Sequence, residues 1–142
     1  MTKLVSSLLC SVLLVAALSG CKSYAANSVM VQPEVASSLN VVNGGLQAEA
    51  QLLPEQSHAL YEGDILVGTV EIKSHVDGRA MYEYRWQWSD ADGIINEVGG
   101  GGETWNTIWL NPLEEKQLQG RSTTPGATAG ELFMRYAMNA TQ

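Results

Sequence analysis

The feature that most constrains the fold of this chain is a strict alternation of aromatic and polar residues between positions 82 and 89. The aromatic side chains stand at every second position: Tyr82, Tyr84, Trp86 and Trp88. The positions between them are polar: Glu83, Arg85, Gln87 and Ser89. Successive side chains of a β-strand point to opposite faces of the sheet. The alternation therefore predicts a strand whose four rings share one buried face and form part of the core.

Turn signals and further alternating segments predict more strands. Asp90-Ala91-Asp92-Gly93 has the composition of a tight turn, and Ile94-Ile95 is expected to begin the return strand of a hairpin. Other candidate strands are residues 66–73, 104–110, 116–121 and 132–138. Residues 46–53 contain good helix formers but end at Pro54, so helix and strand both stay open there. About seven short strands separated by turns predict an all-β, antiparallel β-sandwich.

The first 21 residues have the organisation of an export signal. Lys3 precedes an uncharged segment, residues 4–18, which is shorter than the roughly 20 apolar residues that cross a bilayer. The sequence Leu18-Ser19-Gly20-Cys21 then resembles a bacterial lipobox. This resemblance implies that the Cys21 thiol is diacylated, that the chain is cleaved before Cys21, and that the new amine is acylated. The alternative is an ordinary signal peptide with a cysteine nearby.

These patterns set the expected organisation of the chain. Residues 1–20 are predicted to be the signal peptide, residues 21–40 a lipidated cysteine with a flexible tether, and residues 41–142 the β-sandwich domain. Two or three acyl chains on Cys21 would hold the protein stably at a membrane. Lys22 follows Cys21, and by resemblance to lipoprotein sorting signals this points to the outer membrane with the domain in the periplasm. A cell-surface orientation stays open.

Composition and spacing argue against several classes of function. With 15 acidic against 8 basic residues and a net charge of -7, the chain lacks the basic patch of a nucleic-acid binder. The lipobox resemblance implies that Cys10 is lost with the signal peptide and that Cys21 carries the lipid, which would leave no thiol for a disulfide, a metal or catalysis. His58 and His75 do not have the spacing of metal ligands. The sequence therefore predicts no enzyme, no metal site and no cofactor.

One segment is a candidate binding edge. It combines a glycine run with two tryptophans: Gly99, Gly100, Gly101, Gly102, Trp105 and Trp109. Consecutive glycines predict a mobile loop, and tryptophans are effective anchors for a peptide or a sugar ring when they are exposed. The sequence leaves the exposure of both tryptophans open.

The segment Tyr84-Arg85-Trp86-Gln87-Trp88, the turn at Asp90 to Gly93, Trp105 and Asn111-Pro112 together resemble the YcfL family of small enterobacterial lipoproteins. The resemblance implies an immunoglobulin-like β-sandwich and adds no catalytic residue, because the function of that family is not established. The chain departs from the family pattern in its glycine run and at Ser89. We therefore expect an outer-membrane lipoprotein that acts as a non-catalytic accessory or protein-binding module of the envelope. The alternative is a glycan- or peptidoglycan-binding module that uses exposed tryptophans.

Overall fold

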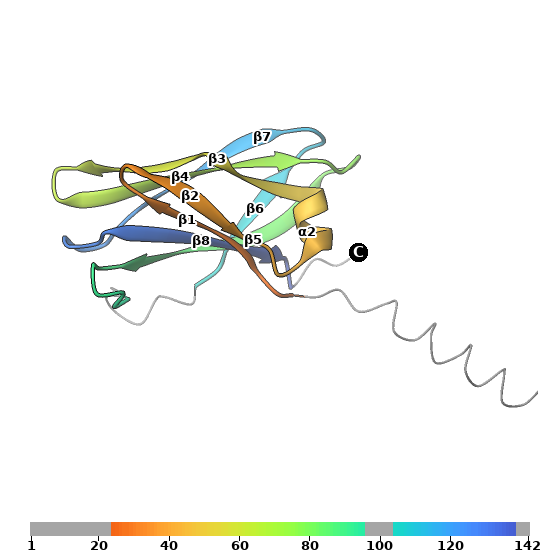
Figure 1. The fold of residues 1–142 in the computed structure, drawn as a ribbon. Helices are drawn as coiled ribbons and strands as arrows, with labels where there is room; N and C mark the ends of the chain where they lie inside the picture. The colour runs from red at the N-terminus through yellow and green to blue at the C-terminus, as the bar shows by residue number, and fades with distance from the viewer. Residues whose placement is uncertain (1–23, 96–103, 139–142) are drawn as a thin grey trace, which may run out of the picture.

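The computed structural model describes residues 24–95 and 104–138. The elements in chain order are β1 (Asn27–Gln32), β2 (Val35–Asn40), α2 (Gly44–Glu49), β3 (Ala50–Glu62), β4 (Ile65–Ser74), β5 (Ala80–Ser89), β6 (Asn106–Leu110), β7 (Glu115–Arg121) and β8 (Ala129–Tyr136). Figure 1 shows the short helix α2 at the end of the strands where the described chain begins. Within residues 24–95 and 104–138, no helix is long and apolar enough to span a bilayer.

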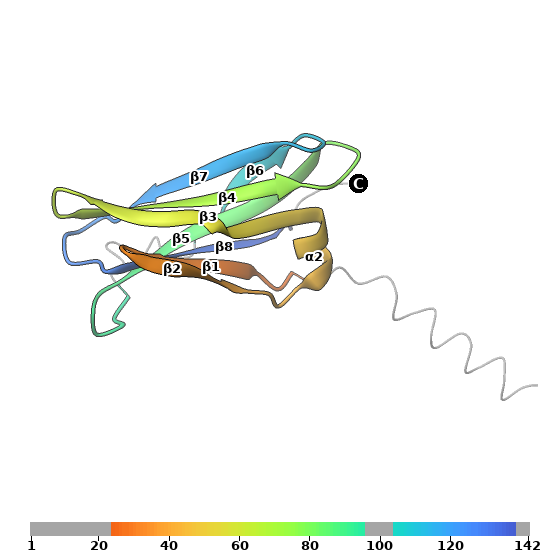
Figure 2. The same ribbon diagram turned by 45° about the horizontal axis from the view of Figure 1, so that its top comes forward.

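The strands form two antiparallel sheets that lie face to face, as Figure 2 shows. One sheet has five strands in the order β2-β1-β8-β5-β6, and the other has three in the order β3-β4-β7. Strands β2 and β3 pack against each other at one side of the sandwich. The edge strands β6 and β7 lie at the other side. The predicted all-β antiparallel sandwich is confirmed, with eight strands in the described residues.

The aromatic face predicted for residues 82–88 is confirmed. Tyr82 and Trp88 are buried, and Tyr84 and Trp86 pack against the core while remaining partly accessible. The Trp86 and Trp88 rings stack with their centroids 5.1 Å apart. On the facing sheet, glycines make room for Trp86, because a Cβ at Gly120 would lie only 2.6 Å from its indole ring. The large Trp86 ring on the five-stranded sheet is thus accommodated by glycines on the three-stranded sheet.

The predicted tether over residues 21–40 is wrong from residue 27 onwards. β1 lies between β2 and β8 in the five-stranded sheet, and its inward side chains Val29 and Val31 are completely buried. Glu34, with φ +62°, makes the turn into β2, whose side chains are mostly exposed. Two valines among small polar residues are a weak strand signal. The strand is stabilised instead by pairing with β8, from the far end of the chain.

The ambiguous segment 46–53 contains both kinds of structure. Asn43 caps α2 by accepting a hydrogen bond from the N–H of Leu46, and the buried Leu46 holds the helix to the core. β3 begins at Ala50 and continues through Pro54, where its register with β4 shifts. The Ser57 hydroxyl stabilises this irregularity, because it donates a hydrogen bond to Leu53 O and accepts one from the N–H of Glu71 in β4. Proline is tolerated here because the regular ladder is interrupted.

The strand predicted at residues 66–73 exists as part of β4, but it is more buried than its alternation indicates. β4 is the central strand of its sheet, between β3 and β7, so neighbouring strands cover both of its edges. Thr69 and Glu71, expected to face water, are only 6% and 8% exposed. Longer side chains on the flanking strands screen polar positions of a central strand, which the local pattern does not reveal.

Candidate functional site

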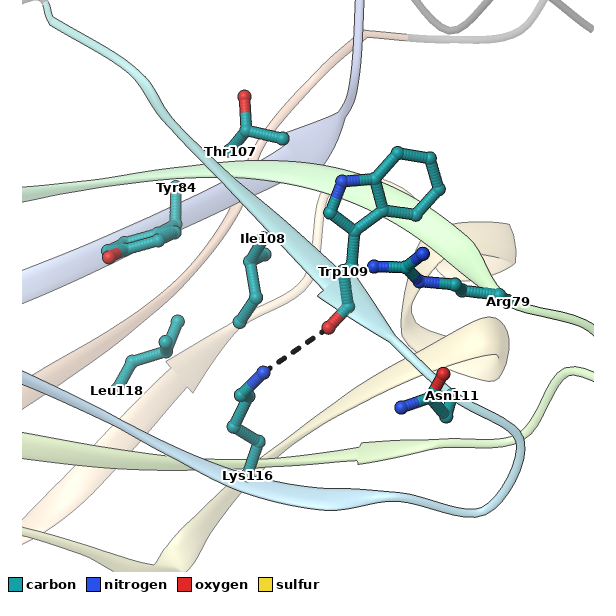
Figure 3. A pocket seen from close by; sticks show the side chains of 8 residues that line it. All are labelled: Arg79, Tyr84, Thr107, Ile108, Trp109, Asn111, Lys116 and Leu118. Atoms are coloured by element: carbon teal, nitrogen blue, oxygen red, sulfur yellow. Dashed lines mark hydrogen bonds between the residues drawn. The ribbon is translucent and has the colours of Figure 1, made fainter.

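A groove of about 440 Å³ lies at the open side of the sandwich, around the edge strands β6 and β7 (Figure 3). It is lined by Arg79, Tyr84, Thr107, Ile108, Trp109, Asn111, Lys116 and Leu118. Tyr84, Ile108 and Leu118 form an apolar floor that belongs to the margin of the core. The other lining residues are polar except for Trp109, whose ring points away from Leu118 and Lys116 in Figure 3. An apolar floor with a few polar groups around it is the usual composition of a binding site.

The alternation of β6 exposes Trp109 at this groove. Ile108 and Leu110 are buried against the core, so Trp109 between them projects to the outside of the five-stranded sheet and is 43% exposed. The guanidinium of Arg79, the residue before β5, lies 4.4 Å from the centroid of the Trp109 ring. This cation–π contact holds the indole in one orientation at the rim.

The turn between β6 and β7 forms the charged wall of the groove. Lys116 Nζ donates a hydrogen bond of 3.3 Å to Trp109 O and lies 3.8 Å from a carboxylate oxygen of Glu114. The other Glu114 oxygen accepts a hydrogen bond of 2.7 Å from the backbone N–H of Asn111. That backbone hydrogen bond, with Lys116 nearby, lowers the pKa of Glu114. Two cations, Arg79 and Lys116, thus line the groove beside an exposed tryptophan, and the Glu114 carboxylate lies next to Lys116.

The two strand edges at the groove differ in character. Trp109 O points away from β5, because it accepts from Lys116, so the N–H and C=O groups of Thr107 and Trp109 face the open side of β6. β6 contains no charged residue, whereas β7 carries Glu115, Lys116 and Arg121. Charged edges are typical of strands protected against further pairing. β6 is the edge suited to accept another strand.

Trp105, the other predicted anchor, has a different environment. It is partly buried on the outer face of the five-stranded sheet, with the Arg135 guanidinium 3.9 Å from its ring centroid. Arg135 also donates to the Glu83 carboxylate at 2.8 Å, and both of these side chains are mostly buried. Trp105 and Trp109 thus stack against different arginines. Of the two tryptophans, Trp109 is the more exposed to solvent.

Several predicted features lie elsewhere or take ordinary roles. Cys21 and the glycines Gly99, Gly100, Gly101 and Gly102 lie outside the described residues. The predicted turn after β5 is present, since Gly93 N–H donates to Asp90 O, and the Asp90 carboxylate accepts from two further backbone N–H groups. Only the bridge from Ser89 to Ile95 represents the return strand in the described residues. No cluster of metal-ligating side chains occurs in residues 24–95 and 104–138.

Sequence reasoning did not find Arg79 and Lys116. Neither belongs to a motif, and they approach Trp109 only because β5 pairs with β6 and the β6–β7 turn brings Lys116 back. The exposure of Trp109, in contrast, has a local signal. Its neighbours Ile108 and Leu110 are the apolar side chains that an edge strand buries, which leaves Trp109 on the other face.

Comparison with known proteins places this architecture in a family. A protein-family model described as "Protein of unknown function (DUF1425)" matches residues 26–136. A crystal structure of a DUF1425 family member from Shewanella sp. PV-4 has a TM-score of 0.56 and 21% sequence identity, covering 78% of this chain and 97% of the other. The structure of Campylobacter jejuni cj0090 has a TM-score of 0.48 and 15% identity, covering 58% of this chain and 84% of the other. No curated protein matches the sequence.

Proposed function

We propose that this chain, which belongs to the DUF1425 family of proteins of unknown function, is a lipid-anchored, non-catalytic binding module of the bacterial cell envelope. The observation that carries the proposal is the groove beside β6, where an uncharged strand edge with no pairing strand among the described residues meets the exposed Trp109. Within the family, the lipobox at Cys21 and the run from Tyr84 to Trp88 support a YcfL-like lipoprotein.

The anchor has a direct test. With Cys21 acylated and followed by Lys22, the protein belongs at the inner leaflet of the outer membrane, with its domain in the periplasm. Wild-type protein should incorporate labelled palmitate and fractionate with outer membranes. Cys21→Ala should lose both the label and the processing, because no other cysteine stands at the end of the apolar segment. A palmitate-labelled Cys21→Ala protein would refute the anchor.

The groove fits an extended peptide segment of a partner protein. Such a segment adds to a sheet edge through main-chain hydrogen bonds, and pockets for its side chains supply specificity. On β6 it would pair with the outward groups of Thr107 and Trp109 and replace the hydrogen bond from Lys116. The Trp109 ring would anchor one of its side chains, and Arg79 and Lys116 favour acidic residues in it.

Cross-linking in intact cells tests this binding mode. A photoreactive amino acid at the exposed Asn106 should capture a partner protein, and the same group at Leu60, an exposed position on β3, should not. Thr107→Pro removes an outward N–H on an edge strand, where proline is tolerated, so the cross-link should disappear while the fold persists. Equal capture at Asn106 and Leu60, or an unchanged cross-link in Thr107→Pro, would refute strand addition.

A second candidate function is binding of cell-wall glycan. The exposed face of Trp109, with Thr107 and Asn111 beside it, has the character of a platform for a sugar ring. Pull-down with isolated peptidoglycan separates the two candidates. A glycan site loses binding in Trp109→Ala and keeps it in Thr107→Pro, because a stacked sugar needs the ring and not the strand edge. A peptide site loses partner capture in Thr107→Pro and does not sediment with peptidoglycan.

A further inference from the structure

Four exposed apolar side chains gather at the end of the sandwich where the described chain begins. They are Tyr24, Val41, Val42 and Met138, with exposed fractions of 47%, 44%, 61% and 54%. β1 begins at this end and β8 finishes there, since Asn27 pairs with Met134, and α2 lies beside them in Figures 1 and 2. Residues from three separate parts of the sequence therefore contribute to one apolar tip.

The exposure of the valines is fixed by buried polar contacts. Asn27 is completely buried, and its carboxamide oxygen accepts hydrogen bonds from the N–H groups of Val42 and Asn43 at 2.9 and 2.7 Å. Its amide group donates to Asn43 O at 2.9 Å. Asn43 then caps α2, and Leu46 of that helix is completely buried. This network holds the loop rigidly, with both valines directed outward although burial would be favourable.

The position of Cys21 says what covers this tip. Only Lys22 to Ala26 separate Cys21 from Asn27, which limits the span between the two Cα atoms to about 21 Å. Tyr24 is three residues from Cys21, so about 11 Å is the maximum there. With β1 and β2 part of the sandwich, the predicted tether of twenty residues reduces to these five. A lipid on Cys21 therefore keeps this end of the domain at the bilayer surface.

We propose that the apolar tip of Tyr24, Val41, Val42 and Met138 inserts into the interfacial region of the bilayer to which Cys21 is anchored. The inference rests on the proposed lipid anchor and adds a fixed orientation of the domain on the lipid. Tyrosine favours the membrane–water interface, and clustered exposed apolar side chains favour burial there. Glu49, the acidic residue at the end of α2, forms a hydrogen bond with Tyr136, which directs its charge toward the protein.

Site-specific fluorescence on the acylated protein tests the insertion. Cleavage removes Cys10 and the lipid occupies Cys21, so Val42→Cys introduces the one free thiol of the mature chain. Val35→Cys is the matched control, because Val35 is an equally exposed valine about 23 Å away along the strand direction. Each variant is labelled with a polarity-sensitive dye and reconstituted in vesicles of phosphatidylethanolamine and phosphatidylglycerol, with and without nitroxide-labelled lipid.

The dye at position 42 should have blue-shifted emission and should be quenched by the nitroxide lipid several-fold more strongly than the dye at position 35. Adding Tyr24→Ser and Val41→Ser to the Val42→Cys protein should abolish that difference while the acyl mass stays unchanged. Equal, water-like signals at positions 42 and 35 in an acylated protein would overturn the insertion and leave the anchor intact. Absence of acyl mass would instead overturn the anchor, and the insertion with it.

Discussion

The complementarity between Trp86 and the glycines of the facing sheet makes a quantitative prediction for Gly120→Ala. A Cβ at Gly120 would lie 2.6 Å from Cδ1 and Nε1 of Trp86 and 2.7 Å from Cγ. These atoms are near the root of the side chain, so a small rotation of the ring does not remove the clash. The ring is also confined by its stack on Trp88 and by Gly68, where a Cβ would lie 2.8 Å away.

The expected magnitude follows from two opposing effects. Overpacking of a well-packed core costs about 1 to 3 kcal/mol, and the confined Trp86 ring places this site near the upper value. The backbone at Gly120 does not have positive φ, so alanine fits the main chain and recovers about 0.4 to 1 kcal/mol through the unfolded state. The free energy of unfolding should therefore fall by about 2 kcal/mol, a large part of the 5 to 15 kcal/mol typical of a domain.

Urea denaturation followed by tryptophan fluorescence measures this change in the acylation-free Cys21→Ser protein. Gly78→Ala is the control, because no heavy atom lies within 4 Å of the Cβ it adds. It should leave stability unchanged or slightly raised. In a Trp86→Ala background, Gly120→Ala should no longer destabilise, which gives a coupling energy of about 2 to 3 kcal/mol. A loss at Gly120 no larger than at Gly78, or an undiminished loss without Trp86, would refute the steric explanation.

Four further predictions concern buried or partly buried polar groups. Tyr82→Phe should stabilise the domain by about 1 kcal/mol, because the buried Tyr82 hydroxyl has no hydrogen-bond partner in the described residues. Burial and nearby Glu49 raise the pKa of Tyr82 and of Tyr136 to about 12, so the unfolded chain loses these protons first and stability should fall as pH rises from 10 to 12. Glu83→Ala should cost about 1 to 2 kcal/mol by leaving the mostly buried Arg135 without its carboxylate. Asn27→Ala should cost roughly 2 to 4 kcal/mol, since three hydrogen bonds to the loop before α2 are lost.

The same denaturation assay checks these values, with tyrosinate absorbance for the pH dependence. Asn40→Ala, at an exposed position on β2, is the control for Asn27→Ala and should change stability by less than about 0.5 kcal/mol. Destabilisation by Tyr82→Phe would mean that the hydroxyl is satisfied after all. Tyrosinate formation with an ordinary pKa of about 10 throughout would contradict the burial explanation.

The sequence was sufficient where the local pattern and the tertiary environment agree. The alternation around Trp86 and the turn at Asp90 predict β5 and its turn because one face is apolar and the turn residues are specific. Val29 and Val31 were too few to indicate β1, and Pro54 obscured β3. These strands form because partners distant in the sequence complete them, with β8 beside β1 and β4 beside β3.

The candidate site was predictable only in part, for a related reason. The sequence singled out Trp109 as a candidate anchor but left its exposure open, and the groove also needs Arg79 and Lys116, which strand pairing brings to it. Gly120 opposite Trp86 likewise has no local signal. Where the alternation is strong, as in β5, a single sequence indicates which residues face inward. It does not report which residues of another sheet they meet.

One end of the groove lies at the same end of the sandwich as the apolar tip, which relates the proposed peptide site to the proposed membrane insertion. The N–H of His75 donates to Glu49 O and the N–H of Ser74 donates to Glu114 O, so α2 and the β6–β7 turn lie at one end. Lys116 is therefore near the proposed bilayer surface, whereas Leu118 lies farther along the groove. A segment in the groove would extend along β6, away from the proposed bilayer surface. An acidic partner segment that enters from the lipid surface would therefore meet the cationic end of the groove, at Lys116, first.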